Sequence, residues 1–146
     1  MRVDFYQLAG LDPAKATAQL AGKAVEAGLR VLVVDEDEAG RQSQSRALWE
    51  QSPEGFLANG IAGGAHDARQ PVLIAEEPTP ANGATVLILA DGHWREPPAA
   101  YDRVMLLFDQ ESLAGARAAW RLLGEQDGAE RRFWKQDERG RWVEGP

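Results

Sequence analysis

The chain alternates short apolar runs with segments whose apolar residues recur at helical spacing. Residues 3–8 alternate aromatic and aliphatic side chains, and residues 30–35 contain the run Val-Leu-Val-Val, so both segments predict strands, the second one buried. Between them, Asp12 and Pro13 are suited to begin a helix, and Gly28 is suited to end it. Strand, helix and strand in this order predict a βαβ unit.

The remaining pattern continues this alternation of strands and helices. An acidic cluster at residues 35–38 precedes a predicted helix that runs to about Trp49, and residues 51–70 read as a long ordered loop. Further strands are predicted at residues 71–75, 85–90 and 103–108, a helix at 110–123, and a hairpin with arms at 132–136 and 141–143 around a turn at 137–140. We therefore expect an α/β, Rossmann-like three-layer fold with a mostly parallel sheet flanked by helices, in one domain spanning residues 1–146.

Composition narrows the class of protein. A chain of 146 residues has the commonest size of a single domain, and it contains no cysteine, which excludes disulfides, thiol catalysis and zinc ribbons. The N-terminus shows no export signal. Apolar runs such as residues 86–90 are far below the ~20 residues that span a bilayer. We expect a cytoplasmic protein without a membrane segment.

The net charge of −7 is unevenly distributed. Residues 1–109 hold 9 Lys and Arg against 16 Asp and Glu, whereas residues 110–146 hold 7 against 7. Binding to nucleic acid requires a cationic surface, because its affinity comes largely from counterion release. Strong direct binding to nucleic acid is therefore disfavoured, and the arginines of the last third favour an acidic protein partner.

Motifs for nucleotide and hydrolase chemistry do not fit their required positions. The glycine-rich segment 60–64 neither follows the first strand nor begins a helix, and the first strand–helix junction, residues 9–13, lacks GxGxxG spacing. The chain contains no GxxxxGK[ST] and no GxSxG. We expect no cofactor and no catalytic residues. The alternative is a small Rossmann-like nucleotide-dependent enzyme or hydrolase.

The two histidines and the acidic cluster at residues 35–38 are the remaining candidates for a catalytic or metal-binding role. His66 and His93, the two histidines, fall in predicted loops without a nucleophile or second ligand at a suitable spacing, which favours solvated side chains. The acidic cluster 35–38 offers ligands for a divalent ion, but the solvated start of a helix is the simpler interpretation. We expect no metal site.

Three residues of the last predicted helix form a candidate binding surface. Arg117, Trp120 and Arg121 have i, i+3 and i+4 spacing, which places them on one helix face. An indole between two guanidinium groups suits a ligand with an apolar end beside carboxylates, although an arginine lying over a tryptophan is also ordinary surface packing. Leu48, Trp49 and Phe56 lie at a predicted helix end and in the following loop, where they either cap the core or form an exposed anchor, and patterning alone favours the core.

The tryptophans of the closing hairpin are expected to play a structural part. Trp134 and Trp142 lie on its two arms and read as cross-strand partners or as a cover for the sheet edge. No ligand role is expected for them.

Several segments together resemble one protein family. They are Asp4-Phe5-Tyr6, Arg30-Val31-Leu32-Val33, Ser45-Arg46-Ala47-Leu48-Trp49, Phe56, Ala62-Gly63 before Pro71-Val72-Leu73-Ile74, Ala116-Arg117-Ala118-Ala119-Trp120-Arg121, and Phe133-Trp134-Lys135-Gln136-Asp137. In order and spacing, these segments are similar to the chi subunit of bacterial DNA polymerase III. The resemblance covers nearly the whole chain, and its specificity lies in the order of the segments rather than in any one of them.

The resemblance implies a non-catalytic accessory subunit of the DNA polymerase III clamp-loader complex. In this family one surface binds the psi subunit, and another binds the acidic C-terminal tail of single-stranded-DNA-binding protein. Arg117, Trp120 and Arg121 match the family's tail site, and the stretch around Trp49 and Phe56 matches its psi-facing surface. The family often has a lysine where this chain has Leu113, which implies a less cationic tail site here.

Overall fold

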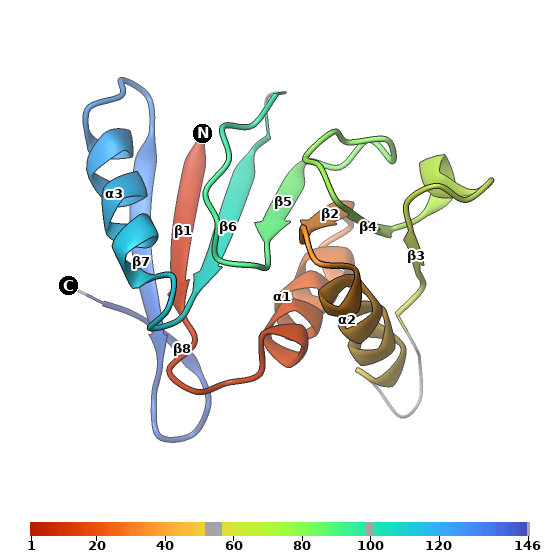
Figure 1. Ribbon diagram of the computed structural model, residues 1–146, viewed down its shortest axis with the longest axis horizontal. Coiled ribbons are helices and arrows are strands. Elements are labelled where there is room, and N and C mark those ends of the chain that lie inside the picture. Colours follow the sequence, from red (N-terminus) through yellow and green to blue (C-terminus); the bar gives the residue numbers. More distant parts are fainter. Residues whose placement is uncertain (52–56, 99–100, 146) are drawn as a thin grey trace.

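The computed structural model describes residues 1–51, 57–98 and 101–145, which form one eight-stranded sheet with three α-helices (Figure 1). The elements are β1 (Arg2–Gln7), α1 (Pro13–Glu26), β2 (Val31–Val34), α2 (Glu38–Glu50), β3 (Asn59–Ile61), the 3-10 helix η1 (Asp67–Arg69), β4 (Val72–Ala75), β5 (Val86–Leu89), β6 (Arg103–Phe108), α3 (Leu113–Gly124), β7 (Glu130–Gln136) and β8 (Trp142–Glu144). Within the described ranges, no helix is both long and apolar enough to cross a membrane.

The strands lie in the order β3-β4-β2-β5-β6-β1-β7-β8. All neighbouring pairs are parallel except β7 and β8, which form an antiparallel hairpin at one edge. The expected α/β class and mostly parallel sheet are thus confirmed. Strands β1 and β2, which α1 connects, are separated in the sheet by β5 and β6. This order differs from the 3-2-1-4-5-6 of dinucleotide-binding sheets, so the Rossmann-like part of the expectation is not confirmed.

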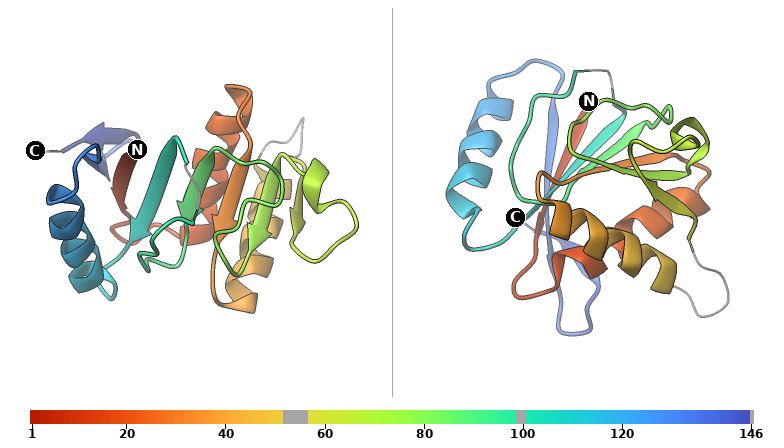
Figure 2. Two further views of the ribbon diagram at one scale, coloured as in Figure 1. Left: turned by 90° about the horizontal axis from the view of Figure 1, so that it is seen from above. Right: turned by 45° about the vertical axis from the view of Figure 1, so that its right-hand side comes forward.

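Helices cover both faces of the sheet. In β2, Val31 and Val33 belong to a core cluster that includes side chains of α1 and α2, whereas Leu32 and Val34 belong to a second cluster that includes side chains of α3. Figures 1 and 2 show α1 and α2 side by side and α3 apart from them, next to β7. Because the central strands are covered on both faces, they are apolar at every position rather than alternating.

The helix ends follow the chemistry expected from the sequence. The Asp12 carboxylate accepts the Ala14 N–H at 3.2 Å as the N-cap of α1. Gly28 follows the end of this helix at φ +84°, a left-handed conformation that glycine adopts without strain. The Asp37 carboxylate accepts the Ala39 N–H at 3.2 Å and caps α2. The predicted boundaries of α1 and α2 are therefore confirmed to within a residue or two.

The segment expected to be a loop, residues 51–70, contains regular structure in its described part. Strand β3 pairs in parallel with β4 at the sheet edge, and η1 follows it. The strand is three residues of Asn-Gly-Ile, too short to show the two-residue alternation that identifies strands in a sequence. A Cβ at Gly60 would come within 2.9 Å of the Gln70 side chain, which would then have to shift.

Two details near the C-terminus also differ from expectation. Helix α3 begins at Leu113 rather than near residue 110, because Asp109 and Ser112 bind each other in a turn, with the Ser112 N–H donating to Asp109 Oδ1 at 3.0 Å. The predicted hairpin is confirmed, but its tryptophans are not register partners. Trp134 lies opposite Glu144, and Trp142 lies opposite Gln136.

Candidate functional site

Helix α3 presents two different faces. Ala116, Ala119 and Leu123 are buried against the sheet at 0–3% exposure. Arg117 and Arg121 are exposed, while Trp120 is half-buried between these two environments. The expected row of arginine, tryptophan and arginine is thus present on the helix surface, but the indole leans toward the sheet and the guanidinium groups face solvent.

The indole of Trp120 borders a surface pocket. Its ring packs edge-on against Phe5 of β1, with ring centroids 5.1 Å apart and an interplanar angle of 73°. The pocket has a volume of about 480 Å³ and is called the Trp120 pocket below; its principal lining residues are Phe5, Phe108, Leu113, Arg117, Trp120 and Phe133. Arg117 contributes the charge among the described lining residues, whereas Arg121 lies outside the lining. This arrangement suits one apolar group with an anion at its edge.

A third arginine, Arg131 of β7, holds Trp120 in place. Its guanidinium lies 4.5 Å from the centroid of the indole, and its Nη1–H donates to the Trp120 carbonyl at 2.8 Å. Gly124 leaves room for this contact, because a Cβ there would come within 2.7 Å of Arg131 Nη1. The arginine that stacks on the indole therefore comes from a strand and not from the helix. Helical spacing gave no sign of it, but the alternation of β7 places Arg131 on the face that α3 covers.

Trp49 lies at the end of α2. Its side chain is 44% exposed, whereas its neighbour Leu48 is fully buried. The structure thus separates the two apolar residues that patterning had grouped together: Leu48 caps the core and Trp49 contributes apolar surface. Phe56, the other residue expected near this surface, lies outside the described residues.

The glycine-rich segment does not present a phosphate-binding loop. The N–H groups of Gly63 and Gly64 donate to the Asp67 carboxylate at 2.9 and 3.1 Å. A carboxylate of the chain itself thus occupies the backbone donors that an anionic ligand would require. His66 precedes η1 and is exposed.

Asp35 and Asp37 of the acidic cluster 35–38 have different structural roles. The buried Asp35 carboxylate accepts Gln44 Nε2–H at 2.8 Å and the Asp37 N–H at 2.8 Å, and Asp37 caps α2. Gly40 lies so close to Asp35 that a Cβ would meet its carboxylate. The interpretation of this cluster as a helix start is confirmed for Asp37, and Asp35 fixes the junction between β2 and α2.

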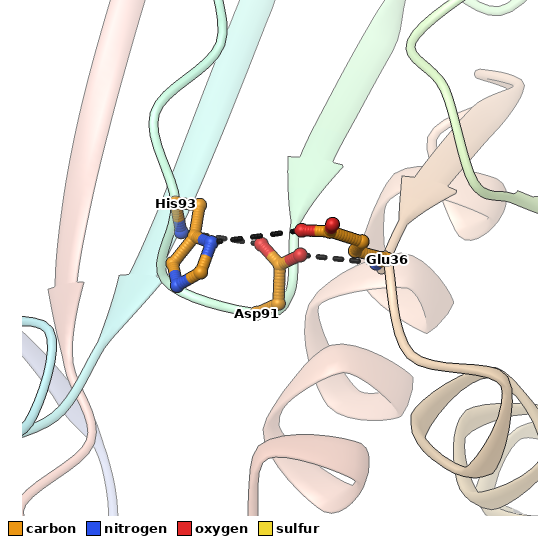
Figure 3. A group of neighbouring side chains, drawn as sticks. All are labelled: Glu36, Asp91 and His93. Atoms are coloured by element: carbon orange, nitrogen blue, oxygen red, sulfur yellow. Dashed lines mark hydrogen bonds and ion pairs between the residues drawn. The ribbon is translucent and has the colours of Figure 1, made fainter.

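The structure brings His93 and its sequence neighbour Asp91 close to Glu36, a carboxylate that the sequence did not connect with them. Figure 3 shows Glu36, Asp91 and His93, whose potential metal-ligating atoms all lie within 4.8 Å of one another. Glu36 and Asp91 follow β2 and β5, and the carboxyl ends of these parallel strands meet at one edge of the sheet. Sheet topology, which spacing along the chain does not reveal, produces this cluster.

The Asp91 carboxylate already has a full set of hydrogen-bond donors. It accepts the backbone N–H groups of Glu36 and His93 at 3.0 and 3.1 Å, and Arg95 donates to its two oxygens at 2.9 and 2.6 Å. Burial alone raises the pKa of Asp91, but the hydrogen bonds from Arg95 and the two backbone amides outweigh it and hold the pKa below its usual value. Four donors fill the lone-pair positions of a carboxylate, so a metal ion would have to displace Arg95. This geometry favours a structural role for the cluster.

Fold and site together define an α/β protein with a surface pocket that suits one apolar group with an anion at its edge. The family model for "DNA polymerase III chi subunit, HolC" matches residues 1–130. The DNA polymerase III subunit chi of Pseudomonas aeruginosa is 33% identical over 90 residues, which are 60% of this chain and 62% of that protein. The chain therefore belongs to the DNA polymerase III chi subunit family, which confirms the resemblance seen in the sequence.

Proposed function

We propose that this chain is a non-catalytic accessory subunit of the DNA polymerase III clamp-loader complex and works as one chi-like domain in the cytoplasm. It bridges the psi subunit and the acidic C-terminal tail of single-stranded-DNA-binding protein during DNA replication. The match of the chi family model over residues 1–130 carries this proposal. The net charge of −7 supports recruitment through a protein rather than through direct contact with DNA.

The Trp120 pocket is the proposed site for the tail. The terminal aromatic ring of the tail enters the pocket between Trp120 and Phe133, and its α-carboxylate meets the Arg117 guanidinium at the rim. Arg121, one turn along the exposed side of α3, meets the aspartates that precede the ring. A buried aromatic anchor is worth ~2 kcal/mol or more, whereas exposed charge pairs contribute about 0.2 to 1 kcal/mol each. The ring therefore supplies most of the affinity.

Leu113 modifies this site. It lines the Trp120 pocket at a position where the family often has a lysine, so the pocket gains apolar wall and loses one cation. We expect this chain to bind the tail with a weaker dependence on salt than relatives that have the lysine, because fewer charge pairs form.

A peptide titration tests the tail site. The ligand is a peptide that ends in several aspartates and a C-terminal phenylalanine, and binding is measured by calorimetry at two salt concentrations. Trp120→Ala should weaken binding about 30-fold or more, and Arg117→Ala about 3- to 10-fold. Arg69→Ala is the matched control, because Arg69 is equally charged and exposed but lies in η1. Equal affinity of all four proteins would refute the site.

The proposed psi-facing surface is the stretch around Trp49 and Phe56. An indole that is 44% exposed at a helix end supplies the kind of aromatic contact that lasting protein interfaces bury. Co-purification with the psi subunit of the same organism tests it. We expect Trp49→Ala and Phe56→Ala to reduce the complex, and Leu122→Ala, which removes a side chain of 46% exposure from α3, to leave it intact. Retention of psi by both aromatic variants would rule this surface out.

A further inference from the structure

A second pocket with cationic and aromatic side chains lies on the opposite face of β1, β6 and β7. It has a volume of about 350 Å³ and is bounded by these strands, the hairpin and the C-terminal half of α1; six of its lining residues are Arg2, Tyr6, Lys23, Arg103, Trp134 and Trp142. We call it the Arg2–Arg103 pocket. Side chains alternate along a strand, so Phe5 faces the Trp120 pocket and Tyr6 faces this one. Neither the expected tail site nor the expected psi surface includes it.

Two arginines in this pocket are held by a single buried carboxylate. Asp4 is fully buried, and its two oxygens accept Arg2 Nε–H at 3.1 Å and Arg103 Nε–H. Trp134 Nε1–H also donates to Asp4 at 2.8 Å, and Arg103 Nη2–H donates to the Tyr6 hydroxyl. The two guanidinium groups are thus fixed in position by groups that lie beneath them. This fixation removes much of the entropy cost that a ligand would otherwise incur in ordering them.

The pocket carries an excess of positive charge. One carboxylate balances one of the two guanidinium groups, and Lys23 of α1 adds an ammonium group, so the lining has a surplus of two positive charges. Outside the lining, the carboxylates of Glu130 and Glu144 lie 2.8 and 3.7 Å from the Arg132 guanidinium. Arg132 therefore offsets one of these two negative charges. The chain as a whole has a net charge of −7, so this local group of cations is unusual, and it would attract an anionic ligand to the cavity.

The remaining walls of the pocket are aromatic and aliphatic. The Tyr6 ring stacks on Trp134 with centroids 6.1 Å apart and an interplanar angle of 12°, and Trp142 meets Tyr6 edge-on at 4.9 Å. Leu20 and Met105 add aliphatic surface. Such walls suit a flat or apolar body attached to the anion.

We propose that the Arg2–Arg103 pocket binds an organic phosphate monoester. A phosphate monoester carries about −1.5 to −2 charges at pH 7, which suits a lining with two guanidinium groups and one ammonium group, and guanidinium groups bind its oxygens in pairs. The phosphate lies between Arg2, Arg103 and Lys23, and the organic body lies against Trp134 and Trp142. Arg2 and Arg103 are the first residues of β1 and β6, so this site is at the opposite end of the strands from the crevice where α/β sheets bind dinucleotides.

Indole N–H signals in NMR spectra provide the test, since Trp134 and Trp142 line this pocket and Trp120 lines the other. The intact chain is titrated with phenyl phosphate and with adenosine 5′-monophosphate, which carry the same anion on different bodies. Inorganic phosphate lacks the organic group and therefore tests its contribution. Benzoate has an aromatic ring but a single negative charge and therefore tests the contribution of the second charge. Both monoesters should shift the signals of Trp134 and Trp142 without shifting that of Trp120, and inorganic phosphate and benzoate should bind more weakly. Failure of both monoesters to shift these two signals, or equal affinity for benzoate, would overturn the proposal.

Variants separate this pocket from general charge effects. Lys23→Gln should weaken phenyl phosphate binding about two- to fivefold, because Lys23 is exposed. Arg2→Gln should weaken it about tenfold, while Arg103 and Trp134 still satisfy Asp4. Lys15→Gln is the control, because it removes the same charge from the same helix outside this lining, and it should change nothing. An equal loss in Lys15→Gln and Lys23→Gln would contradict the site.

The two sites are tested independently by one further variant. Trp120→Ala should lose the acidic tail peptide and keep phenyl phosphate, since the indole belongs to the Trp120 pocket alone. Loss of phenyl phosphate binding in this variant would place the ligand in the Trp120 pocket and refute the proposal.

Discussion

The Trp120 pocket and the Arg2–Arg103 pocket are built from neighbouring residues of the same strands but hold their cations in opposite ways. Strand β7 contributes Phe133 to the first and Trp134 to the second. In the first, Arg117 is exposed, and among the residues that the structure describes no ion pair restrains its side chain. In the second, the arginines are bound to a carboxylate that water does not reach.

This difference has consequences for binding. A mobile, solvated guanidinium adapts to a flexible peptide and gives an interaction that salt weakens readily. Guanidinium groups fixed by a buried acid keep one geometry and therefore suit one small anion. The same residue type thus suits the proposed peptide site on one face of the sheet and the proposed anion site on the other.

The largest expected effect comes from removing the buried acid. Asp4→Asn leaves Arg2 and Arg103 at the sheet face without their counter-charge, and we expect a loss of about 3 kcal/mol in the free energy of unfolding. Arg117→Gln, the corresponding change in the other pocket, should cost less than about 0.5 kcal/mol because that side chain is exposed. Urea denaturation of both variants measures the difference. Similar losses would show that Asp4 does not set the two pockets apart.

The two tyrosines provide a second, pH-dependent comparison. Burial raises the pKa of Tyr6 to about 12, although the adjacent Arg103 opposes this, and burial also raises the pKa of Tyr101 to about 12. In the unfolded chain both ionise near pH 10. Their contribution to stability is therefore complete below pH 10 and is lost as the pH rises toward 12, by roughly 2 kcal/mol for each tyrosine.

Ultraviolet titration measures this prediction. The chain contains two tyrosines, so the absorbance change reports on both. The native protein should ionise near pH 12 and the urea-unfolded protein near pH 10. Asp4→Asn should lower the native midpoint of Tyr6, because the negative charge of Asp4 helps to raise its pKa. Native ionisation near pH 10 would mean that the tyrosine hydroxyls are solvated.

Arg131 allows a change within the Trp120 pocket itself. Arg131→Ala removes the contact with the indole face and the hydrogen bond to the Trp120 carbonyl, and we expect a loss of about 1 kcal/mol in stability. Binding of the acidic peptide should weaken about threefold, because the indole is then less well fixed. Arg131→Lys, which keeps the charge without the planar guanidinium, should recover only part of both losses. Full recovery would show that charge alone matters.

The sequence predicted features that depend on local spacing. Asp12, the acidic cluster 35–38 and Gly28 indicated helix ends because these signals involve residues a few positions apart. The row of Arg117 and Trp120 on one side of α3 was likewise visible from the 3.6-residue period. Helical spacing did not reveal that Arg131, 11 residues further along the chain, lies over the indole of Trp120.

Longer-range partnerships were even less accessible to sequence reasoning. Asp4 and Arg103 meet because β1 pairs with β6, and they are 99 residues apart in the chain. A charged residue within a strand gives no indication of its partner in the next strand. The strand order is equally hidden, since β1 lies between β6 and β7 rather than beside β2. Both pockets therefore depend on the strand order, which no local pattern in the sequence reveals.

The smallest expected effect concerns metal ions at Glu36, Asp91 and His93. In this cluster Arg95 forms an ion pair with Asp91. Asp4, in contrast, forms ion pairs with two arginines, Arg2 and Arg103. Because Arg95 and two backbone amides fill the Asp91 oxygens, we expect Zn²⁺ to leave the melting temperature of the native chain unchanged. Arg95→Ala should free the carboxylate and make the melting temperature rise with added Zn²⁺.

The His93 side chain distinguishes a real metal site from unspecific binding in this experiment. It lies 4.0 Å from Glu36 and is 64% exposed, so it is able to turn toward an ion held by Asp91. In the Arg95→Ala background, His93→Ala should abolish the response to Zn²⁺, since a pair of carboxylates without a nitrogen ligand binds Zn²⁺ weakly. A response of the unaltered chain to Zn²⁺ that His93→Ala removes would mean that Arg95 yields to the metal, and the cluster would then be a site in its own right.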